Sequence, residues 1–443
     1  MVVGGGAAGM SAALALAEAG RRVTLLEAGA LLGGRARSFR DRRSATELDW
    51  GPHLFMAANP ALRDLLRRIG AAPRLRLPPA LDLTYRLADP AAPGGVRLAR
   101  LAFPPEGGVL ARLAALLRWR GPGPLARLGI ARGLLRALSS REGGAGTVEE
   151  MLVRLGQGEA AREWFWEPFA RAVLNLPLGK GSAALFRRVL LESFGAGPQG
   201  AALGTPDLPL GAFWAAPAAE RIRSLGGEVR TKSPARRILI EGGRSRGVLL
   251  PGGERVEADA VVAAVPPPAL LALLPEELRG EAPWRDVARL RPGPIASAYL
   301  WLDRPAPGPP FEALMGEPWH WLFRPTAAAP EGEGAGPLAL LAGGEDSIAA
   351  QGRGRLEDAA RETLSRLLPG CGIRRVLVVR ERAATWANGA DEQDWRPGPE
   401  TPIGGLCLAG DWTATGLPAT VEGAVRSGRL AAELILTGAL SSF

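Results

Sequence analysis

Val2-Val3-Gly4-Gly5-Gly6-Ala7-Ala8-Gly9 places the pattern Gly-x-Gly-x-x-Gly directly after a short apolar segment. Small residues follow from Ala8 to Ala19 and predict a helix, and Gly20 stands where a glycine commonly follows a helix. A second apolar segment, Val23-Thr24-Leu25-Leu26, then leads to Glu27. The order of strand, glycine turn, helix and strand predicts an α/β unit.

Each part of this unit has a physical role in a dinucleotide site. Gly4 permits the tight turn, Gly6 lets the backbone approach a pyrophosphate, and Gly9 lets the helix pack closely on the strand. The helix N-terminus presents free N–H groups and the positive end of its dipole to the phosphates. Glu27 lies roughly 20 residues further on, where a carboxylate accepts hydrogen bonds from ribose hydroxyls. The sequence therefore predicts a Rossmann-like domain that binds a dinucleotide.

A second glycine-rich segment decides which dinucleotide is expected. Immediately after the second strand the chain reads Gly33-Gly34-Arg35-Ala36-Arg37-Ser38. Two glycines and an arginine at this point are typical of flavin-binding proteins, in which backbone and guanidinium groups approach the phosphates of FAD. The alternative is a flexible surface loop with two solvated arginines, which the complete first motif disfavours. We therefore expect FAD in preference to a nicotinamide cofactor.

The composition indicates how many domains the chain has and which kinds of partner it could bind. A chain of 443 residues with 47% hydrophobic content favours two joined domains with a large interior. The formal net charge of +9 comes almost wholly from arginine, because Lys180 and Lys232 are the only lysines. Nucleic acid is not expected, since no zinc spacing, recognition helix or aromatic RNA motif accompanies the charge. An anionic membrane surface is a better partner, and arginines spread over a solvated surface are the alternative.

The cysteines and the apolar runs bear on location. Cys371 and Cys407 are too few for a disulfide framework or a cysteine metal site, so we expect both thiols reduced in the interior and no metal. No charge-free run of ~18 residues could span a bilayer. No basic segment leads the first strand, so no secretory signal is expected. The expected location is cytoplasmic, and peripheral contact with the inner face of the cell membrane is left open.

Residues 97–138 combine leucine and alanine with arginine. Two helices are expected, at 109–119 and 125–138, separated by Gly121-Pro122-Gly123-Pro124, and the region has a single acid, Glu106. Basic amphipathic helices with a tryptophan at one end can lie in a membrane interface. The alternative is that both pack on the domain with their arginines in water. The arginines are Arg97, Arg100, Arg112, Arg118, Arg120, Arg127, Arg132 and Arg136.

The middle of the chain holds several local signals. Thr147 and Glu150 predict a capping box at a helix start. The aromatic stretch 164–177 suits either a long apolar ligand pocket or a plain helix core. His320, between two tryptophans, is expected in the core or in a pocket wall. Residues 205–209 are expected in a loop, and the glycine turns within 221–253 predict β hairpins.

Near the C-terminus a strand is expected to deliver Gly410-Asp411, where a carboxylate can bind ribityl hydroxyls. A helix then begins near Ala419-Thr420 and directs its N-terminus at a ligand. A reduced flavin carries negative charge near its pyrimidine ring, which a helix N-terminus favours. An ordinary strand, loop and helix does not explain the many glycines and the acid at the turn.

Together these motifs resemble the FAD-dependent amine oxidase and carotenoid desaturase superfamily, and within it the hydroxysqualene dehydroxylases, or squalene-associated FAD-dependent desaturases. The resemblance extends over nearly the full length. Many members carry Asn-Gly-Gln-His where this chain has Trp50-Gly51-Pro52-His53, which removes two polar groups near the expected flavin face. The narrower resemblance rests on Gly51-Pro52-His53, Trp166-Glu167-Pro168, Asn175-Leu176-Pro177, Thr205-Pro206 and residues 410–428.

The resemblance implies reductive removal of the allylic hydroxyl of hydroxysqualene, a long apolar isoprenoid, to give squalene for isoprenoid and hopanoid synthesis. Oxidative desaturation of a polyene such as phytoene, or another amine-oxidase-like oxidation, is the alternative. A flavin-dependent membrane scaffold without catalysis is a third hypothesis. We expect an FAD-binding domain from roughly 1–75, 216–270 and 396–443, with an interleaved α+β substrate domain from 76–215 and 271–395.

The implied reaction needs a dry apolar tunnel and one proton donor that helps the hydroxyl leave as water, while reduced FAD supplies a hydride. The candidate donors are Glu167, His53 and Asp207, and Arg171 and Asn175 are candidates for orienting the donor. The residues expected at FAD are Gly4, Gly6, Ala7, Ala8, Gly9, Glu27, Ala28, Gly33, Gly34, Arg35, Gly51, Pro52, His53, Ala235, Gly410, Asp411, Ala419 and Thr420.

Overall fold

A computed structural model describes residues 1–139, 144–197, 199–324 and 336–438. Its first sheet has five parallel strands in the order β10-β2-β1-β14-β20. Parallel neighbours need crossover connections, so segments far apart in the sequence meet in this sheet. The sheet confirms the predicted Rossmann-like α/β fold. Its strands are β1 (Val2–Val3), β2 (Thr24–Leu26), β10 (Glu228–Arg230), β14 (Val261–Ala263) and β20 (Leu406–Leu408).

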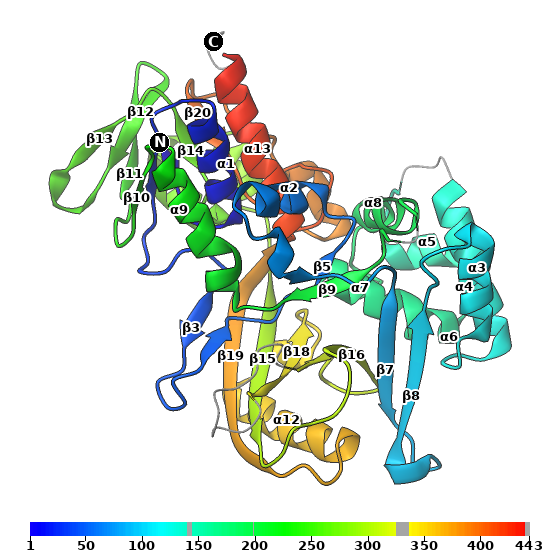
Figure 1. The fold of residues 1–443 in the computed structure, drawn as a ribbon. Coiled ribbons are helices and arrows are strands. Elements are labelled where there is room, and N and C mark those ends of the chain that lie inside the picture. The colour runs from blue at the N-terminus through cyan, green and yellow to red at the C-terminus, as the bar shows by residue number, and fades with distance from the viewer. Residues whose placement is uncertain (140–143, 198, 325–335, 439–443) are drawn as a thin grey trace.

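The two faces of this sheet are covered differently. Successive strand residues point to opposite faces, so Val2 and Leu25 pack on one layer and Val3 and Leu26 on the other. The first layer is helical (Figure 1) and contains α1 (Ala7–Glu18), α2 (Pro60–Arg68), α9 (Ala216–Ser224) and α13 (Val421–Thr437). The second layer contains the antiparallel sheet β11 (Arg237–Glu241), β12 (Arg244–Leu249) and β13 (Arg255–Glu257), with α10 (Pro267–Leu273) and α11 (Trp284–Val287).

The second large sheet has seven strands in the order β19-β15-β18-β17-β16-β7-β8. All neighbours are antiparallel except β16 and β7. One face packs on α12 (Arg353–Leu367), and the other faces a large aromatic core. The strands are β7 (Asp82–Ala88), β8 (Val96–Ala102), β15 (Pro292–Leu302), β16 (Phe311–Met315), β17 (Trp321–Phe323), β18 (Leu338–Gly343) and β19 (Ile373–Trp386).

A group of helices covers the aromatic core of this second sheet (Figure 1). The helices expected at 109–119 and 125–138 are confirmed as α3 and α4. The capping box is also confirmed, because Thr147 Oγ1 accepts from the Glu150 N–H and the Glu150 carboxylate accepts from the Thr147 N–H. The helices are α3 (Gly108–Arg118), α4 (Pro124–Ser139), α5 (Val148–Arg154), α6 (Glu159–Ala161), α7 (Glu167–Leu174) and α8 (Ala183–Phe194).

Two local expectations were only partly right. Within 221–253, the hairpin turns at Gly242-Gly243 and Gly252-Gly253 are confirmed, because they join β11 to β12 and β12 to β13 in antiparallel pairs. Residues 221–224 close α9, and β10 after them pairs in parallel with β2, because alternation within a strand does not reveal the direction of its partner. The loop expected at 205–209 begins as β9 (Leu203–Pro206), which pairs with β5 (Phe55–Met56) and β6 (Leu75–Arg76). The remaining hairpin joins β3 (Ser38–Arg40) to β4 (Glu47–Asp49).

The two large sheets draw on different parts of the chain. Every strand of the five-stranded sheet falls within 1–75, 216–270 or 396–443, and every strand of the seven-stranded sheet falls within 76–215 or 271–395. The division of the chain into two domains at these limits stays a prediction.

Candidate functional site

A cavity of about 890 Å³ is lined by residues of both large sheets and of the helices beside them. One part of its wall is formed by the glycine-rich segments that follow β1, β2 and β20. Another part is formed by aliphatic and aromatic side chains of the seven-stranded sheet and of α7 and α8. The cavity therefore joins the expected nucleotide site to an apolar chamber.

The glycines after β1 shape the first part of the wall. Gly4 has a φ of +110°, and a Cβ on Gly9 would lie 1.9 Å from the Gly4 carbonyl oxygen, so only glycine lets α1 start this close to β1. At Gly6 a Cβ would meet only Gly34 Cα, at 3.8 Å, so the backbone stays open toward the cavity. No side chain caps the N-terminus of α1. Its free N–H groups suit a phosphate.

Glu27 directly follows β2 and lies beside this turn. Its Oε2 accepts from the Gly5 N–H at 2.8 Å, and its Oε1 accepts from the Gly29 N–H at 2.6 Å. These two bonds hold the carboxylate at the cavity wall, with lone pairs still available for further donors. The position fits a carboxylate that receives ribose hydroxyls.

Arg35 connects the glycine-rich segment after β2 to the one after β20, and it also connects the two large sheets. Its Nη2 donates to Asp411 Oδ1 at 2.5 Å, and its Nη1 donates to the Ala384 carbonyl oxygen on β19 at 2.9 Å. Asp411, which follows β20, exposes only 6% of its side chain, so the charge-assisted bond fixes both groups at the wall. The guanidinium is thereby held facing the space between the two sheets.

The N-terminus of α13 lines the same cavity. Thr420 caps the helix by accepting from the Gly423 N–H at 3.2 Å, and the Ala419 N–H donates to Asn388 Oδ1 at 2.7 Å. A Cβ on Gly428 would lie 2.0 Å from the Ala8 carbonyl oxygen, so this glycine lets α13 pack directly on α1. The positive dipole ends of α1 and α13 are thus directed at one site.

The structure brings together nearly all residues expected at the cofactor. Seventeen of the eighteen line this cavity, from Gly4 to Thr420, and Gly9 lies behind them, between α1 and the Gly4 turn. Their contacts with FAD itself stay a prediction. The donor set, the open backbone at Gly6 and Gly34, and the two helix N-termini fit a flavin dinucleotide.

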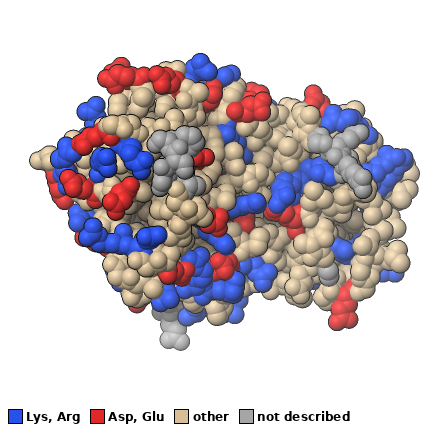
Figure 2. Space-filling view, turned by 90° about the horizontal axis from the view of Figure 1, so that it is seen from above, with Lys and Arg blue, Asp and Glu red and all other residues tan. Residues whose placement is uncertain are grey.

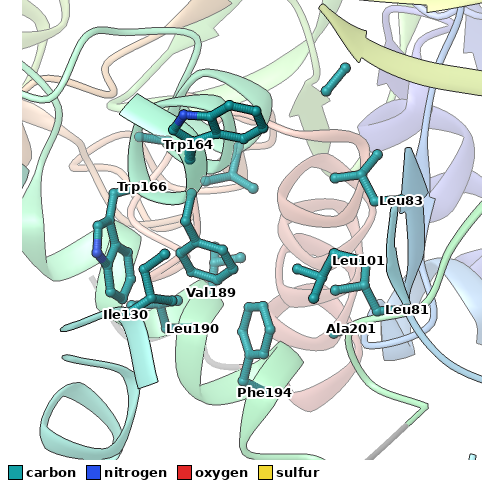
Figure 3. Close-up of a cluster of buried hydrophobic side chains, with 14 of the residues drawn as sticks. Leu81, Leu83, Leu101, Ile130, Trp164, Trp166, Val189, Leu190, Phe194 and Ala201 are labelled. Carbon is teal, nitrogen blue, oxygen red and sulfur yellow. The ribbon is translucent and has the colours of Figure 1, made fainter. Parts of the chain in front are cut away.

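Figure 3 shows a cluster of buried hydrophobic side chains, some of which form the apolar part of the wall. Leu83 and Leu101 face Val189 and Phe194 across it, and all four line the cavity. The stretch 164–177 was expected to form either a ligand pocket or a helix core, and each interpretation holds for some of its residues. Phe165, Phe169 and Val173 line the cavity, whereas Trp164 and Trp166 are buried behind the wall. The contribution of β7 and β8 to this wall was not predicted, although apolar residues alternate in β7 at Leu83, Tyr85 and Leu87.

Two histidines line the cavity among these apolar side chains. His53 Nδ1 lies 2.8 Å from the Gly51 carbonyl oxygen, which can only accept, so Nδ1 carries the hydrogen and Nε2 is left as an acceptor. His320 Nδ1 instead accepts from the Gly343 N–H at 3.3 Å, so its Nε2 carries the hydrogen in the neutral ring. The two rings therefore offer opposite hydrogen-bonding groups.

Burial keeps both rings neutral. It lowers the pKa of His53 below the ordinary value. It also lowers the pKa of His320 to about 4, with a further decrease from the nearby charge of Arg171. The Arg171 guanidinium lines the cavity and is paired with Asp346 at 2.6 Å. A proton that reaches His320 is therefore given up readily.

Two of the three candidate proton donors do not line the cavity. Glu167 accepts from Arg171 Nε at 2.6 Å and from the Leu178 N–H at 3.3 Å, and these partners turn its carboxylate away. Asp207 pairs with Arg76 at 2.6 Å and lines a separate cavity of about 800 Å³. Of the three alternative candidates, only His53 lines this cavity, and which residue donates the proton stays a prediction. Asn175 does line the cavity, where its Nδ2 donates to the Pro294 carbonyl and to Thr385.

Other features of the described chain bear on chemistry and location. Within the described residues, no cluster of three or more His, Cys, Asp or Glu side chains could hold a metal ion. Cys407 is buried in the five-stranded sheet, and burial raises the pKa of its thiol to about 12. Among the described residues, no helix combines the length and apolar composition that crossing a bilayer requires.

The chain is similar over nearly its full length to proteins of known name. Relatives that match over 98% of this chain include the hydroxysqualene dehydroxylases of Sinorhizobium fredii and Rhodopseudomonas palustris, each 31% identical, with 98% and 97% of their own lengths covered. A 15-cis-phytoene desaturase of an Oncidium hybrid is 26% identical, with 77% of its length covered. Similar solved structures include an oxidoreductase of Methanosarcina mazei, with a TM-score of 0.73 at 19% identity and 98% and 99% coverage of the two chains.

A second solved structure, putrescine oxidase bound to putrescine, also has a TM-score of 0.73, at 18% identity and 98% coverage of both chains. The model of the flavin containing amine oxidoreductase family matches residues 7–436, which is nearly the whole chain. That range contains the α1 N-terminus, Arg35, Asp411 and the N-terminus of α13, the groups that fit a flavin. The chain therefore belongs to the flavin-containing amine oxidoreductase family.

Proposed function

We propose that this protein is an FAD-dependent enzyme that removes the allylic hydroxyl of hydroxysqualene reductively and releases squalene and water. The observation that carries the proposal is the single cavity in which the glycine-rich nucleotide wall meets an aliphatic and aromatic chamber. The names of the full-length relatives at 31% identity support this substrate.

FAD, rather than a smaller flavin, suits the wall because the nucleotide half has a complete set of partners. The turn at Gly4–Gly6 and the segment Gly33–Gly34 would hold the pyrophosphate, and Glu27 would receive the ribose hydroxyls. Asp411 would face the ribityl chain, and the N-terminus of α13 would face the pyrimidine ring. When bound and reduced, FAD supplies a hydride.

The chamber fits a long hydrocarbon. Its wall contains aliphatic and aromatic side chains from several separate helices and strands, and such a wall excludes water from a cationic intermediate. An isoprenoid chain has no polar groups to satisfy, so its burial there is favoured by roughly 25 cal/mol per Å² of apolar surface. The wall includes Leu81, Leu83, Leu101, Phe165, Phe169, Val173, Val189, Phe194, Trp321, Phe323 and Leu341.

The two histidines are the groups that we assign to the hydroxyl. The neutral His320 ring donates a hydrogen bond from Nε2–H to the leaving oxygen. For turnover the ring first takes up one proton from solvent, and its low pKa then makes it a strong acid that transfers this proton to the oxygen and returns to the neutral form. His53 Nε2 accepts from the hydroxyl hydrogen and thereby orients the group. Proton delivery to the oxygen lets it leave as water, and the delocalised allylic cation remains in the dry chamber.

The direct test compares two reactions on the same purified holoenzyme. Anaerobically reduced enzyme is incubated with hydroxysqualene, oxidised enzyme is incubated with phytoene, and products are analysed by gas and liquid chromatography. The proposal requires squalene in the first reaction and no coloured polyene in the second. A desaturated product from phytoene, with no squalene from hydroxysqualene, would replace the proposal by the oxidative alternative.

A further inference from the structure

The helices α3 and α4 expose apolar side chains. Single exposed leucines are ordinary on protein surfaces, but a concentration of them marks an interaction site. Leu110 and Leu125, in the first turns of the two helices, are 80% and 86% exposed. Six of the nine strongly exposed large apolar side chains of the described chain lie here. We call these six the α3–α4 apolar surface: Val109, Leu110, Leu117, Leu125, Leu128 and Leu135.

The same helices carry positive charge without any acid. Residues 107–139 contain six arginines and no Asp or Glu. Arg112 and Arg127 donate to backbone carbonyls, and the other four arginines are exposed. Figure 2 shows Lys and Arg side chains at the end of the molecule that these helices form. In the described part of the chain, none of the six forms an ion pair with a carboxylate. They are Arg112, Arg118, Arg120, Arg127, Arg132 and Arg136.

These helices are attached to the wall of the apolar chamber. Arg112 Nη1 donates to the Phe194 carbonyl oxygen at 3.1 Å, and the Phe194 ring lines the cavity. Leu116 of α3 is buried in the same core as Phe103 and Leu101, and Leu101 also lines the cavity. Any structure that binds to α3 and α4 would therefore lie close to the apolar chamber.

We propose that α3 and α4 dock this protein on the surface of a bilayer that contains anionic lipid. Exposed leucines beside arginines match the two layers of such a surface, since apolar side chains enter the acyl boundary while guanidinium groups remain among the phosphates. The unpaired positive charge is complementary to anionic headgroups. The proposal rests on this surface alone and is independent of the substrate proposed above.

Two other occupants are less consistent with the surface. Nucleic acid would use the arginines but would leave Leu110 and Leu125 in water. A second copy of this chain would bring six arginines against six arginines in a two-fold contact, with no acid on these helices to offset the repulsion. A bilayer alone satisfies both the apolar and the charged side chains.

Vesicle flotation of the full-length holoprotein tests the proposal. The vesicles consist of phosphatidylcholine alone or with about 30% phosphatidylglycerol, a content that gives a strongly negative surface. We expect flotation only with the anionic vesicles, and weaker flotation at high salt. The variant Leu110→Asp/Leu125→Asp should abolish it. Arg132→Gln/Arg136→Gln should reduce the partition coefficient roughly 30-fold, from about fivefold for each arginine.

Matched controls lie elsewhere on the molecule. Leu98→Asp changes a leucine that is 53% exposed on β8, and Arg237→Gln/Arg246→Gln removes two exposed arginines from the β11–β12 hairpin, on the opposite side of the molecule (Figure 1). Both controls should float like the wild type. Circular dichroism and bound flavin absorbance report whether each variant is folded.

Three outcomes would overturn the proposal. The first is absence of flotation with anionic vesicles, and the second is equal loss in the controls and the α3–α4 variants. The third is a dimer, seen by light scattering, that Leu110→Asp/Leu125→Asp converts to a monomer while flotation is unchanged. Flotation needs no turnover. Membrane binding can therefore be judged even if the enzyme does not convert hydroxysqualene, and a protein that does not float can still be assayed for that activity.

Discussion

Arg35 and Asp411 lie 376 residues apart in the chain, and their side chains meet at 2.5 Å between Arg35 Nη2 and Asp411 Oδ1. This contact ties the glycine-rich segment after β2 to the strand end after β20. Through the Ala384 carbonyl, Arg35 also holds β19 of the other large sheet. The cofactor wall and the wall of the apolar chamber are therefore coupled through one guanidinium.

Replacing this guanidinium should weaken cofactor binding. Arg35→Leu leaves Asp411 buried without its charged partner, and we expect FAD affinity to fall at least about tenfold, because hydrogen bonds to charged groups contribute roughly 1.5–3 kcal/mol. Titration of the apoprotein with FAD by flavin fluorescence measures this change. Arg246→Gln, an exposed arginine on β12, is the control, and an equal loss there would contradict the assignment.

Gly34 should be required for the cofactor in a way that other left-handed glycines are not. Its φ is +60°, and a Cβ would lie 3.1 Å from Gly6 Cα, at the wall of the cavity. Gly20 has a φ of +73° and open space around it. Gly34→Ala and Gly20→Ala should each lose roughly 1 kcal/mol of stability. Only Gly34→Ala should purify without flavin, as read from its absorbance spectrum.

His320 should make the protein sensitive to acid. Its folded pKa is lowered to about 4, so the unfolded chain takes up the proton first as the pH falls below 6.5, and stability is lost between these values. From about pH 7 to pH 5 the wild type should lose up to roughly 2 kcal/mol more than His320→Gln, less any screening at the cavity. Urea unfolding at both pH values provides the measurement. Parallel losses in the two proteins would contradict the assignment.

Turnover should distinguish the two candidate donors. His320→Gln removes the acid while its side-chain oxygen can still accept from the Gly343 N–H, so we expect a loss of turnover of roughly 100-fold or more with FAD still bound. Glu167→Gln alters a carboxylate outside the cavity, so most of the turnover should remain. Squalene formation by reduced enzyme under single-turnover conditions is the readout. The reverse order of effects would restore Glu167 to the acid role.

Local motifs were predictable because their chemistry lies in adjacent residues. The glycine turn from Gly4 to Gly9, the acid Glu27 directly after β2 and the helix start at Thr420 each follow from short patterns. The pairing of Thr147 with Glu150 is equally local. Such patterns determine the local backbone whatever packs against it. The nucleotide side of the site and these helix and strand ends could therefore be predicted from the sequence.

The chamber depended on tertiary contacts that no local pattern contains. Glu167 and Arg171 stand one helical turn apart, yet only the guanidinium lines the cavity, because Leu178 and Arg171 itself hold the carboxylate elsewhere. The opposite tautomers of His53 and His320 are set by Gly51 and Gly343, and Gly343 lies at the end of β18, whereas His320 precedes β17. The contribution of β7 and β8 to the wall likewise depends on their pairing with β16.

The central claim is that reduced flavin at this site transfers hydride to hydroxysqualene as its allylic hydroxyl leaves as water. The most direct measurement mixes anaerobically reduced enzyme, in excess, with hydroxysqualene, and follows flavin absorbance together with product formation. We expect one squalene formed for each flavin oxidised, with no oxygen required. Flavin that stays reduced while hydroxysqualene is recovered unchanged would contradict it.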